Sequence, residues 1–215
     1  MEHSNSLYLA GTLAGRPEAN HEVQGEIFYH LTLVVPRLSG ALDLLPVTAS
    51  KRLVDAVPLY TGMPLAIEGQ LRAYNKPVEG TGRLLLTAFA QRLYAPHGEG
   101  EAPPRNPNLL CLTGALCKPP VHRTTPLGRE IADMILAVNR AYGKSDYIPC
   151  VVWGKGARLA ATLRVGEPLA LEGRLQSRPY EKRLPQGTVQ QRTAYEVSVA
   201  RLLTPQTEEA NAPQG

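Results

Sequence analysis

Apolar residues along this chain come in short runs, and glycine, proline or charged residues separate one run from the next. Runs of this length, bounded by turn-forming residues, are typical of β-strands. Over residues 157–163, the alanine content and the apolar spacing are instead those of a short helix. In the C-terminal half the pattern predicts five strands, at Leu109–Leu116, Ile131–Val138, Tyr147–Trp153, Leu169–Arg178 and Thr193–Leu202.

The N-terminal half follows the same plan. A helix over Arg52–Leu59, which Pro58 must shorten, separates its third and fourth strands. Five strands with one helix between the third and the fourth is the layout of an oligonucleotide-binding (OB) barrel. We therefore predict an all-β fold with short helices, built from two tandem five-stranded Greek-key OB barrels. The strands of the first barrel are expected at Leu7–Leu13, Tyr29–Val35, Leu44–Ser50, Leu65–Ala73 and Leu84–Leu93.

The two halves are copies of one another. The segment Leu9–Leu13 returns 103 positions later as Leu112–Leu116, and Gly62–Leu71 matches Gly166–Leu175. A period of this length is too long for a solenoid, whose units run roughly 20 to 50 residues. The repeat therefore indicates a domain duplication.

The composition places the domain boundaries. We expect a first OB domain at residues 1–96, a Pro/Gly-rich linker at 97–107, a second OB domain at 108–205 and a disordered tail at 206–215. No run reaches the roughly 18 apolar residues of a membrane span, and the first residues lack the pattern of a signal peptide. We therefore expect a cytoplasmic protein.

Positive charge is concentrated in the second copy. Residues 1–107 contain 9 Lys and Arg against 10 Asp and Glu, whereas residues 108–205 contain 14 against 7. A basic domain beside a neutral one indicates a polyanion as partner. The three cysteines, Cys111, Cys117 and Cys150, have no zinc or redox spacing, and we interpret them as reduced, buried, small apolar residues.

Two segments of the second copy resemble the bacterial single-stranded-DNA-binding (SSB) proteins. In Asp146–Lys155 an acidic residue and an aromatic lead into an apolar strand that ends in tryptophan, and Leu169–Glu181 contains the signature E-G-R-L-x-x-R-x-Y-E. The resemblance spans nearly all of residues 108–203 and is weaker over residues 5–95. It implies single-stranded DNA binding in replication, recombination or repair. It also implies base-stacking aromatics at Tyr142, Tyr147, Trp153 and Tyr180.

The alternation of side chains exposes some of the same residues. On the third strand, Tyr147, Pro149, Val151 and Trp153 share one face, opposite an apolar core face. On the fourth strand, Arg174, Gln176 and Arg178 point outward. Unpaired bases stack on such rings while cations follow the phosphates. The candidate DNA-binding residues are Arg140, Tyr142, Lys144, Tyr147, Trp153, Lys155, Arg174, Arg178, Tyr180, Lys182 and Arg183.

The first copy lacks these aromatics. Ser39, Leu44 and Ser50 stand where the second copy has Tyr142, Tyr147 and Trp153. We therefore expect this face to be unable to stack bases, and the first barrel to act as a structural or dimerising unit. Its possible auxiliary DNA contacts are Arg37, Arg72, Tyr74 and Lys76.

Several alternatives stay open from the sequence. No catalytic, phosphate-loop or metal-ligand motif is present, so we expect no enzyme activity, no cofactor and no metal. A protein-docking module of the primosomal replication protein N type, with a surface at Leu38, Leu44 and Pro46, or a single-stranded RNA binder would share much of this pattern.

The assembly is open as well. A homodimer would reach the family's usual four OB barrels, whereas the linker could instead let the two barrels pair within one chain. The final residues, Glu208–Gly215, lack the acidic tip with which SSB proteins recruit replication enzymes, so we expect no such recruitment.

Overall fold

The computed structural model describes residues 5–78, 81–96, 106–183 and 187–203, so most of the predicted linker and the predicted tail lie outside the described residues. These residues form twelve strands and three short helical segments. The first half contains β1 (Asn5–Leu13), β2 (Glu18–Val23), β3 (Glu26–Pro36), β4 (Leu42–Ser50), α1 (Lys51–Asp55), β5 (Pro64–Val78) and β6 (Thr81–Tyr94). The second contains β7 (Asn108–Leu116), β8 (Val121–Thr124), β9 (Glu130–Asn139), η1 (Ala141–Gly143), β10 (Ser145–Trp153), α2 (Lys155–Ala160), β11 (Pro168–Arg183) and β12 (Val189–Leu203).

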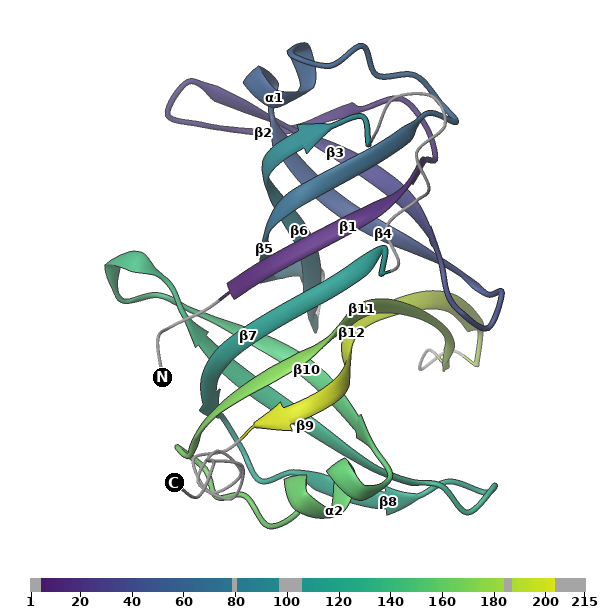
Figure 1. The fold of residues 1–215 in the computed structure, drawn as a ribbon, viewed down its shortest axis with the longest axis vertical. Coiled ribbons are helices and arrows are strands. Elements are labelled where there is room, and N and C mark those ends of the chain that lie inside the picture. The colour runs from purple at the N-terminus through teal and green to yellow at the C-terminus, as the bar shows by residue number, and fades with distance from the viewer. Residues whose placement is uncertain (1–4, 79–80, 97–105, 184–186, 204–215) are drawn as a thin grey trace, which may run out of the picture.

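Each half closes into a barrel (Figure 1). In the first, β1 pairs with both β5 and β3, and a parallel contact between β4 and β6 completes the ring. In the second, β7, β9, β10, β12 and β11 pair in the same order. The predicted OB fold is thereby confirmed. The edge strands β2 and β8 were not predicted, because every residue on them is exposed and no apolar alternation marks them.

The glycine of the repeated Leu-x-Gly motif is required where two strands cross. A Cβ on Gly11 would lie 2.3 Å from the carbonyl oxygen of Val34, and a Cβ on its counterpart Gly114 would lie 2.3 Å from that of Ala137. Only glycine allows so close an approach of two backbones. The duplicated motif is therefore a requirement of barrel closure.

The two barrels pair with one another inside one chain. Strands β1 and β7 run antiparallel, with Leu7 opposite Leu110, so the sheet continues from one barrel into the other (Figure 1). This is the intrachain pairing that the sequence left open as one of two possibilities. Leu7 and Leu110 are both buried, and they join the two barrel interiors into one apolar core.

Two matching polar clamps lie on either side of this strand pair. In one, Arg37 and Asp43 of the first barrel contact Ser177 of the second. In the other, Arg140 and Asp146 of the second barrel contact Ala73 of the first. The arginine and aspartate of the second clamp lie 103 positions after those of the first. Each copy thus contains the same Arg–Asp pair that contacts the other barrel, and this repetition gives the chain an approximate internal twofold symmetry.

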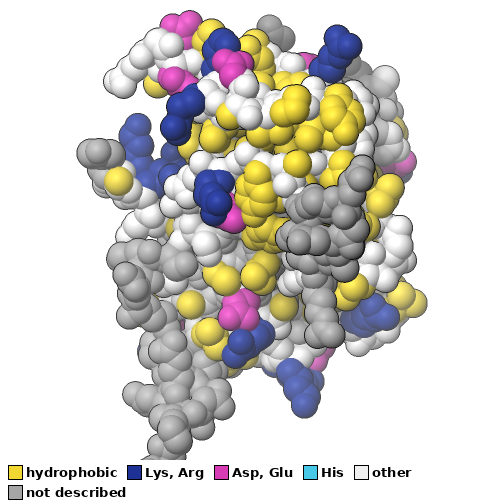
Figure 2. All heavy atoms as spheres, turned by 45° about the horizontal axis from the view of Figure 1, so that its top comes forward, with side chains coloured by type: hydrophobic (Ala, Val, Ile, Leu, Met, Phe, Trp, Pro, Cys, Tyr) yellow, Lys and Arg dark blue, Asp and Glu magenta, His cyan; other side chains and the backbone are white. Residues whose placement is uncertain are grey.

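Hydrophobic side chains gather on the surface of the first barrel, as the view with that barrel turned forward shows (Figure 2). None of the helices in the described ranges is long and apolar enough to cross a membrane.

The three cysteines are free thiols. Only Cys150 is fully buried as expected, whereas Cys111 is half-buried and Cys117 is exposed. Burial, with a smaller contribution from Glu196, raises the pKa of the Cys150 thiol.

Candidate nucleic-acid interface

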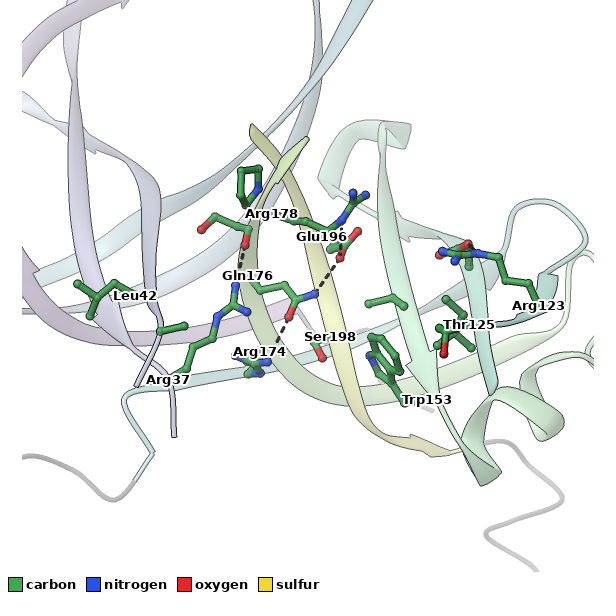
Figure 3. Close-up of a pocket in the computed structure, with 16 residues that line it drawn as sticks. Arg37, Leu42, Arg123, Thr125, Trp153, Arg174, Gln176, Arg178, Glu196 and Ser198 are labelled. Atoms are coloured by element: carbon green, nitrogen blue, oxygen red, sulfur yellow. Dashed lines mark hydrogen bonds and ion pairs between the residues drawn. The ribbon is translucent and has the colours of Figure 1, made fainter. Parts of the chain in front are cut away.

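A groove of about 710 Å³ lies on the outer face of the second barrel (Figure 3). Strands β10, β11 and β12 supply its floor, and β8 and β9 supply one side. The first barrel contributes the opposite side through the hairpin that joins β3 to β4. The groove is lined by Trp153, Val151, Arg174, Gln176, Arg178, Pro179, Glu196 and Ser198, by Arg123, Thr125, Ile131 and Asp133 on the β8–β9 side, and by Arg37, Ala41, Leu42 and Ser177.

Two aromatic rings stand on the outward face of β10. Tyr147 is 51% exposed and Trp153 is 44% exposed, whereas Ile148, Cys150 and Val152 between them are buried in the core. The alternation of side chains along the strand produces this separation. Trp153 lies at the groove, and both rings offer a flat surface to solvent.

The other two predicted aromatics differ in what the structure describes. Tyr180 is half-buried near the end of β11, opposite Arg192 on β12. Tyr142 lies in the η1 turn before β10, and its side chain is outside the described part of the structure.

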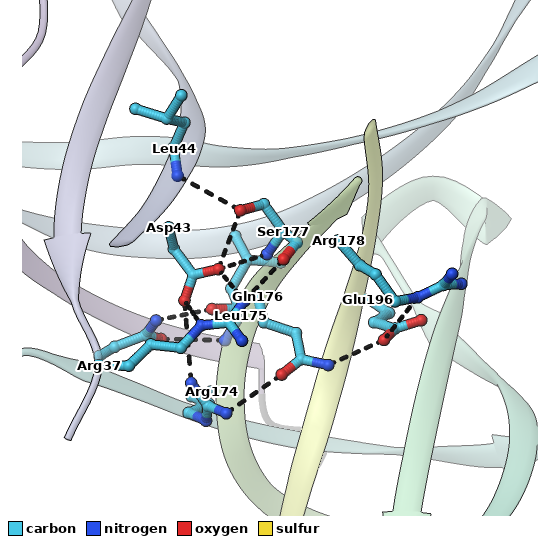
Figure 4. A network of polar contacts seen from close by, with 10 residues as sticks. Arg37, Asp43, Leu44, Arg174, Leu175, Gln176, Ser177, Arg178 and Glu196 are labelled. Carbon is cyan, nitrogen blue, oxygen red and sulfur yellow. Dashed lines mark hydrogen bonds and ion pairs between the residues drawn. The ribbon is translucent and has the colours of Figure 1, made fainter. Parts of the chain in front are cut away.

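A row of polar side chains runs along β11 through the groove. Arg178 is exposed and pairs with Glu196 at 3.6 Å. Gln176 faces outward as the alternation predicts, but it is only 7% exposed. It donates to Glu196 at 2.8 Å and accepts from Arg174 at 3.2 Å, so these neighbours satisfy its amide from both sides (Figure 4).

Two arginines from different barrels share one buried carboxylate. Arg37 donates from Nε to Asp43 at 2.7 Å, and Arg174 pairs with the same carboxylate at 3.8 Å (Figure 4). Burial lowers the pKa of Arg174, and the charge of Arg37 lowers it further. Burial alone would raise the pKa of Asp43, but hydrogen bonds from Arg37 and Ser177 hold that pKa below its usual value. The cluster therefore has two positive charges against one negative charge at the junction of the barrels.

The structure gives Arg140 a different environment from the one expected. It was predicted as a DNA contact, but its guanidinium donates to the buried carboxylate of Asp146 and to the carbonyl oxygen of Ala73 in the other barrel. The sequence pattern does not reveal this, because Asp146 and Ala73 belong to different copies. Arg140 holds the two barrels together.

The other predicted cations lie on segments that flank the groove. Lys144 is exposed just before β10, Lys155 is exposed at the start of α2, and Arg183 is exposed at the end of β11, where Lys182 is half-buried. The loop that follows is only partly within the described residues. One groove cation was missed: Arg123 on β8, which pairs with Asp133 at 2.9 Å. Because every residue of β8 is exposed, no alternation in the sequence marks Arg123.

The auxiliary positions of the first barrel are spread over the junction. Arg37 lines the groove, as described above. Arg72 pairs with Asp146 at 3.3 Å, and Tyr74 is exposed on β5. The side chain of Lys76 is outside the described residues. Among the described residues, no group of three His, Cys, Asp or Glu side chains is arranged to hold a metal ion.

The second barrel matches a known family. Residues 107–204 fit the model of the Single-strand binding protein family. Over 81 residues the chain is 42% identical to single-stranded DNA-binding protein 2 of Listeria innocua, which covers 34% of this chain and 51% of that protein. The single-stranded DNA-binding protein of Bacillus cereus is also 42% identical over 81 residues, covering 34% of this chain and 48% of the relative. The chain thus spans about half the length of these curated relatives.

A solved structure resembles both barrels together. The wild-type single-stranded DNA binding protein from Thermus aquaticus matches with a TM-score of 0.73 at 24% identity, covering 95% of this chain and 94% of that one. A deletion mutant of the same protein matches with a TM-score of 0.74, also at 24% identity, covering 95% and 96%. At this identity the likeness concerns the fold. The comparisons thus relate residues 107–204 to the Single-strand binding protein family and the arrangement of both barrels to a solved structure.

Proposed function

We propose that this protein binds single-stranded DNA without sequence preference and protects it during replication, recombination or repair. The observation that carries the proposal is the pair of exposed rings, Tyr147 and Trp153, on one face of a strand beside a cation-lined groove. Rings exposed in line suit unpaired bases, because every base has a flat face to stack, and the stacking is sequence-tolerant. The similarity of residues 107–204 to the Single-strand binding protein family supports the choice of DNA.

The side chains divide into two roles in this proposal. Tyr142, Tyr147, Trp153 and Tyr180 stack on bases. Arg174 and Arg178 contact phosphates inside the groove, joined by Arg37 and Arg123, while Lys144, Lys155, Lys182 and Arg183 contact the strand at either end. Arg140 is left out, because its guanidinium is committed to Asp146 and Ala73.

The Arg37–Arg174 pair gives the first barrel a part in the same site. Its two positive charges face one carboxylate, so a phosphate of the bound strand can supply the missing negative charge. Leu42, which is exposed beside them, adds apolar surface for a sugar or base. In this proposal the strand therefore crosses the junction instead of staying on one barrel.

We propose further that residues 1–96 and 108–205 are the two domains, and that two chains associate into a homodimer with four barrels. The hydrophobic side chains gathered on the first barrel support such an association, because exposed apolar patches mark interaction sites. Analytical ultracentrifugation of the full chain tests it: a single species with twice the chain mass is expected. Sedimentation at the mass of one chain at micromolar concentration would rule the homodimer out.

The binding proposal is tested by the salt dependence of oligonucleotide affinity. Binding driven by phosphate contacts releases counterions, so the affinity for oligo-dT is expected to fall steeply as salt rises. The exposed Leu38, Leu42 and Leu44 on and beside the first-barrel hairpin favour one alternative, a protein-docking module, for which affinity for its partner would vary little with salt. Tighter binding of oligo-U than of oligo-dT would identify an RNA-binding protein instead.

A further inference from the structure

Aromatic rings are present on the outward face of the first barrel, which corresponds to the groove face of the second. They lie on the strands beside β4 and not on β4 itself. Strand β4 has Ser50 where β10 has Trp153, as the sequence predicts. Strand register, however, places Phe28 of β3 opposite Ser50 and Phe89 of β6 opposite Thr48. Opposed residues of paired strands point to the same side of the sheet. Both phenylalanines therefore share the outward face of β4.

The rings form a continuous row across four strands. The centroids of Phe28 and Phe89 are 5.8 Å apart with their planes tilted by 40°, and the ring of His21 on β2 stacks on Phe28 at 5.1 Å and 12°. These spacings are those of attractive aromatic pairs. Because β4 contributes only small side chains here, Ser50 and Thr48, the two phenylalanine rings can meet above it.

The row is separate from the hydrophobic core. The half-buried apolar residues of the first barrel that pack against the core are Tyr29, Leu53, Val54, Val57 and Leu59. Phe28 and Phe89 are also half-buried, but they lie on the other side of the sheet, and His21 is exposed. The three rings therefore cover the outer face and keep part of their surface open to solvent.

The equivalent face of the second barrel also has an aromatic ring, but that ring is on the central strand β10 instead of on the neighbouring strands. There, Ile131 and Ser198 occupy the positions of Phe28 and Phe89, and Trp153 occupies that of Ser50. Where the central strand is aromatic its neighbours are not, and where the central strand is small its neighbours are aromatic. The expectation that this face is unable to stack bases was drawn from β4 alone and did not include the rings on β2, β3 and β6.

We propose that His21, Phe28 and Phe89 form a second base-stacking platform, so that both barrels hold one DNA strand. The proposal rests on the proposed function. The platform is expected to contact bases more than phosphates. Arg72, the nearest cation on β5, is already paired with Asp146 and Gln70. The carboxylate of Glu18, which lies opposite His30 on the same face, would repel a phosphate. This platform adds length to the site with little added charge.

Paired substitutions in the full-length chain test the proposal. Two lengths of oligo-dT distinguish binding to one barrel from binding to both. One OB barrel covers roughly 4–16 nucleotides, so an oligonucleotide of about 10 nucleotides occupies one barrel and one of about 30 nucleotides can reach both. With the oligonucleotide in excess, F28A/F89A is expected to bind the long oligonucleotide about tenfold or more weakly than the unmodified chain does, from the usual contribution of a stacked base. Quenching of Trp153 by the short oligonucleotide should not change.

The matched control is Tyr60→Ala, which removes an aromatic ring that is 62% exposed before β5. It should bind both lengths like the unmodified chain. Equal affinity of F28A/F89A and the unmodified chain for the long oligonucleotide overturns the second platform and leaves the proposed function standing. Absence of binding by the unmodified chain overturns both.

A second experiment does not depend on the stability of F28A/F89A. In W153F/F89W the only indole lies at position 89, and the aromatic row is kept. Oligo-dT of about 30 nucleotides is expected to quench this indole, whereas in the control W153F/Y60W the emission should stay unchanged. Unchanged emission of W153F/F89W on saturation with the oligonucleotide overturns the proposal.

Discussion

Asp43 of the first barrel accepts two hydrogen bonds from Ser177 of the second, one from the backbone N–H at 2.6 Å and one from the hydroxyl at 2.9 Å, both at the same carboxylate oxygen. The equivalent Asp146 accepts a backbone N–H from Ala73 at 2.6 Å. Each aspartate therefore accepts a backbone N–H from within a strand of the other barrel, and its own arginine neutralises its charge. This arrangement fixes the position of the first-barrel hairpin that forms one side of the groove.

Removing this carboxylate should destabilise the protein strongly. Asp43 is 1% exposed, and D43A would leave Arg37 without its ion pair and the N–H of Ser177 without its acceptor. Breaking a buried ion pair costs about 3–5 kcal/mol, so the free energy of unfolding in urea is expected to fall by about that amount. The control D55A removes an exposed helical ion pair with Lys51 and should unfold almost like the unmodified chain. Equal denaturation midpoints for D43A and D55A would refute this role.

The same clamp should make stability depend on pH in the acid range. The pKa of Asp43 is held below its usual value in the folded chain, so its contribution is fully present above the unfolded pKa of about 3.9. That contribution is lost as the pH falls through the lower, folded pKa. The free-energy difference between the unmodified chain and D43N should be constant above about pH 5 and shrink below it. A difference that does not change down to about pH 2.5 would contradict the assignment.

Arg178 should account for part of the salt dependence of binding. It is exposed on the groove, and its pairing with Glu196 at 3.6 Å leaves it available to a phosphate. R178A is expected to reduce the slope of log affinity against log salt by about one, because one phosphate contact is lost. R158A removes an exposed arginine on α2 that pairs with Glu130, and its slope should equal that of the unmodified chain. Identical slopes for R178A and R158A would place Arg178 outside the phosphate path.

Tyr147 should contribute stacking energy without affecting the salt slope. Its ring projects from β10 and is not needed by the core, so Y147A should fold normally. The loss of one stacked base costs about 1–3 kcal/mol of binding free energy. Fluorescence anisotropy with labelled oligo-dT measures this loss, and Y60A again supplies the comparison. Binding by Y147A as tight as that by Y60A would mean that the ring carries no base.

The sequence correctly predicted the features that are determined within a single strand, such as which side chains face the core. The alternation along β10 separated Tyr147 and Trp153 from the core correctly, because period-two burial is a local property. The commitment of Arg140 to Asp146 and Ala73 was missed, since those contacts join two barrels. The Phe28–Phe89 row was missed because it depends on the register of β3, β4 and β6, which no single strand encodes. Arg123 was missed because its edge strand has no buried face.

The emission of Trp153 during titration with oligo-dT tests the central claim most directly, because this residue is the only tryptophan of the chain. If its ring stacks on bases in the groove, emission falls to a plateau, and the affinity obtained from that curve decreases steeply as salt is raised. Emission that stays constant while oligo-dT demonstrably binds would mean that the strand lies elsewhere on the molecule, and the account of the groove would be wrong.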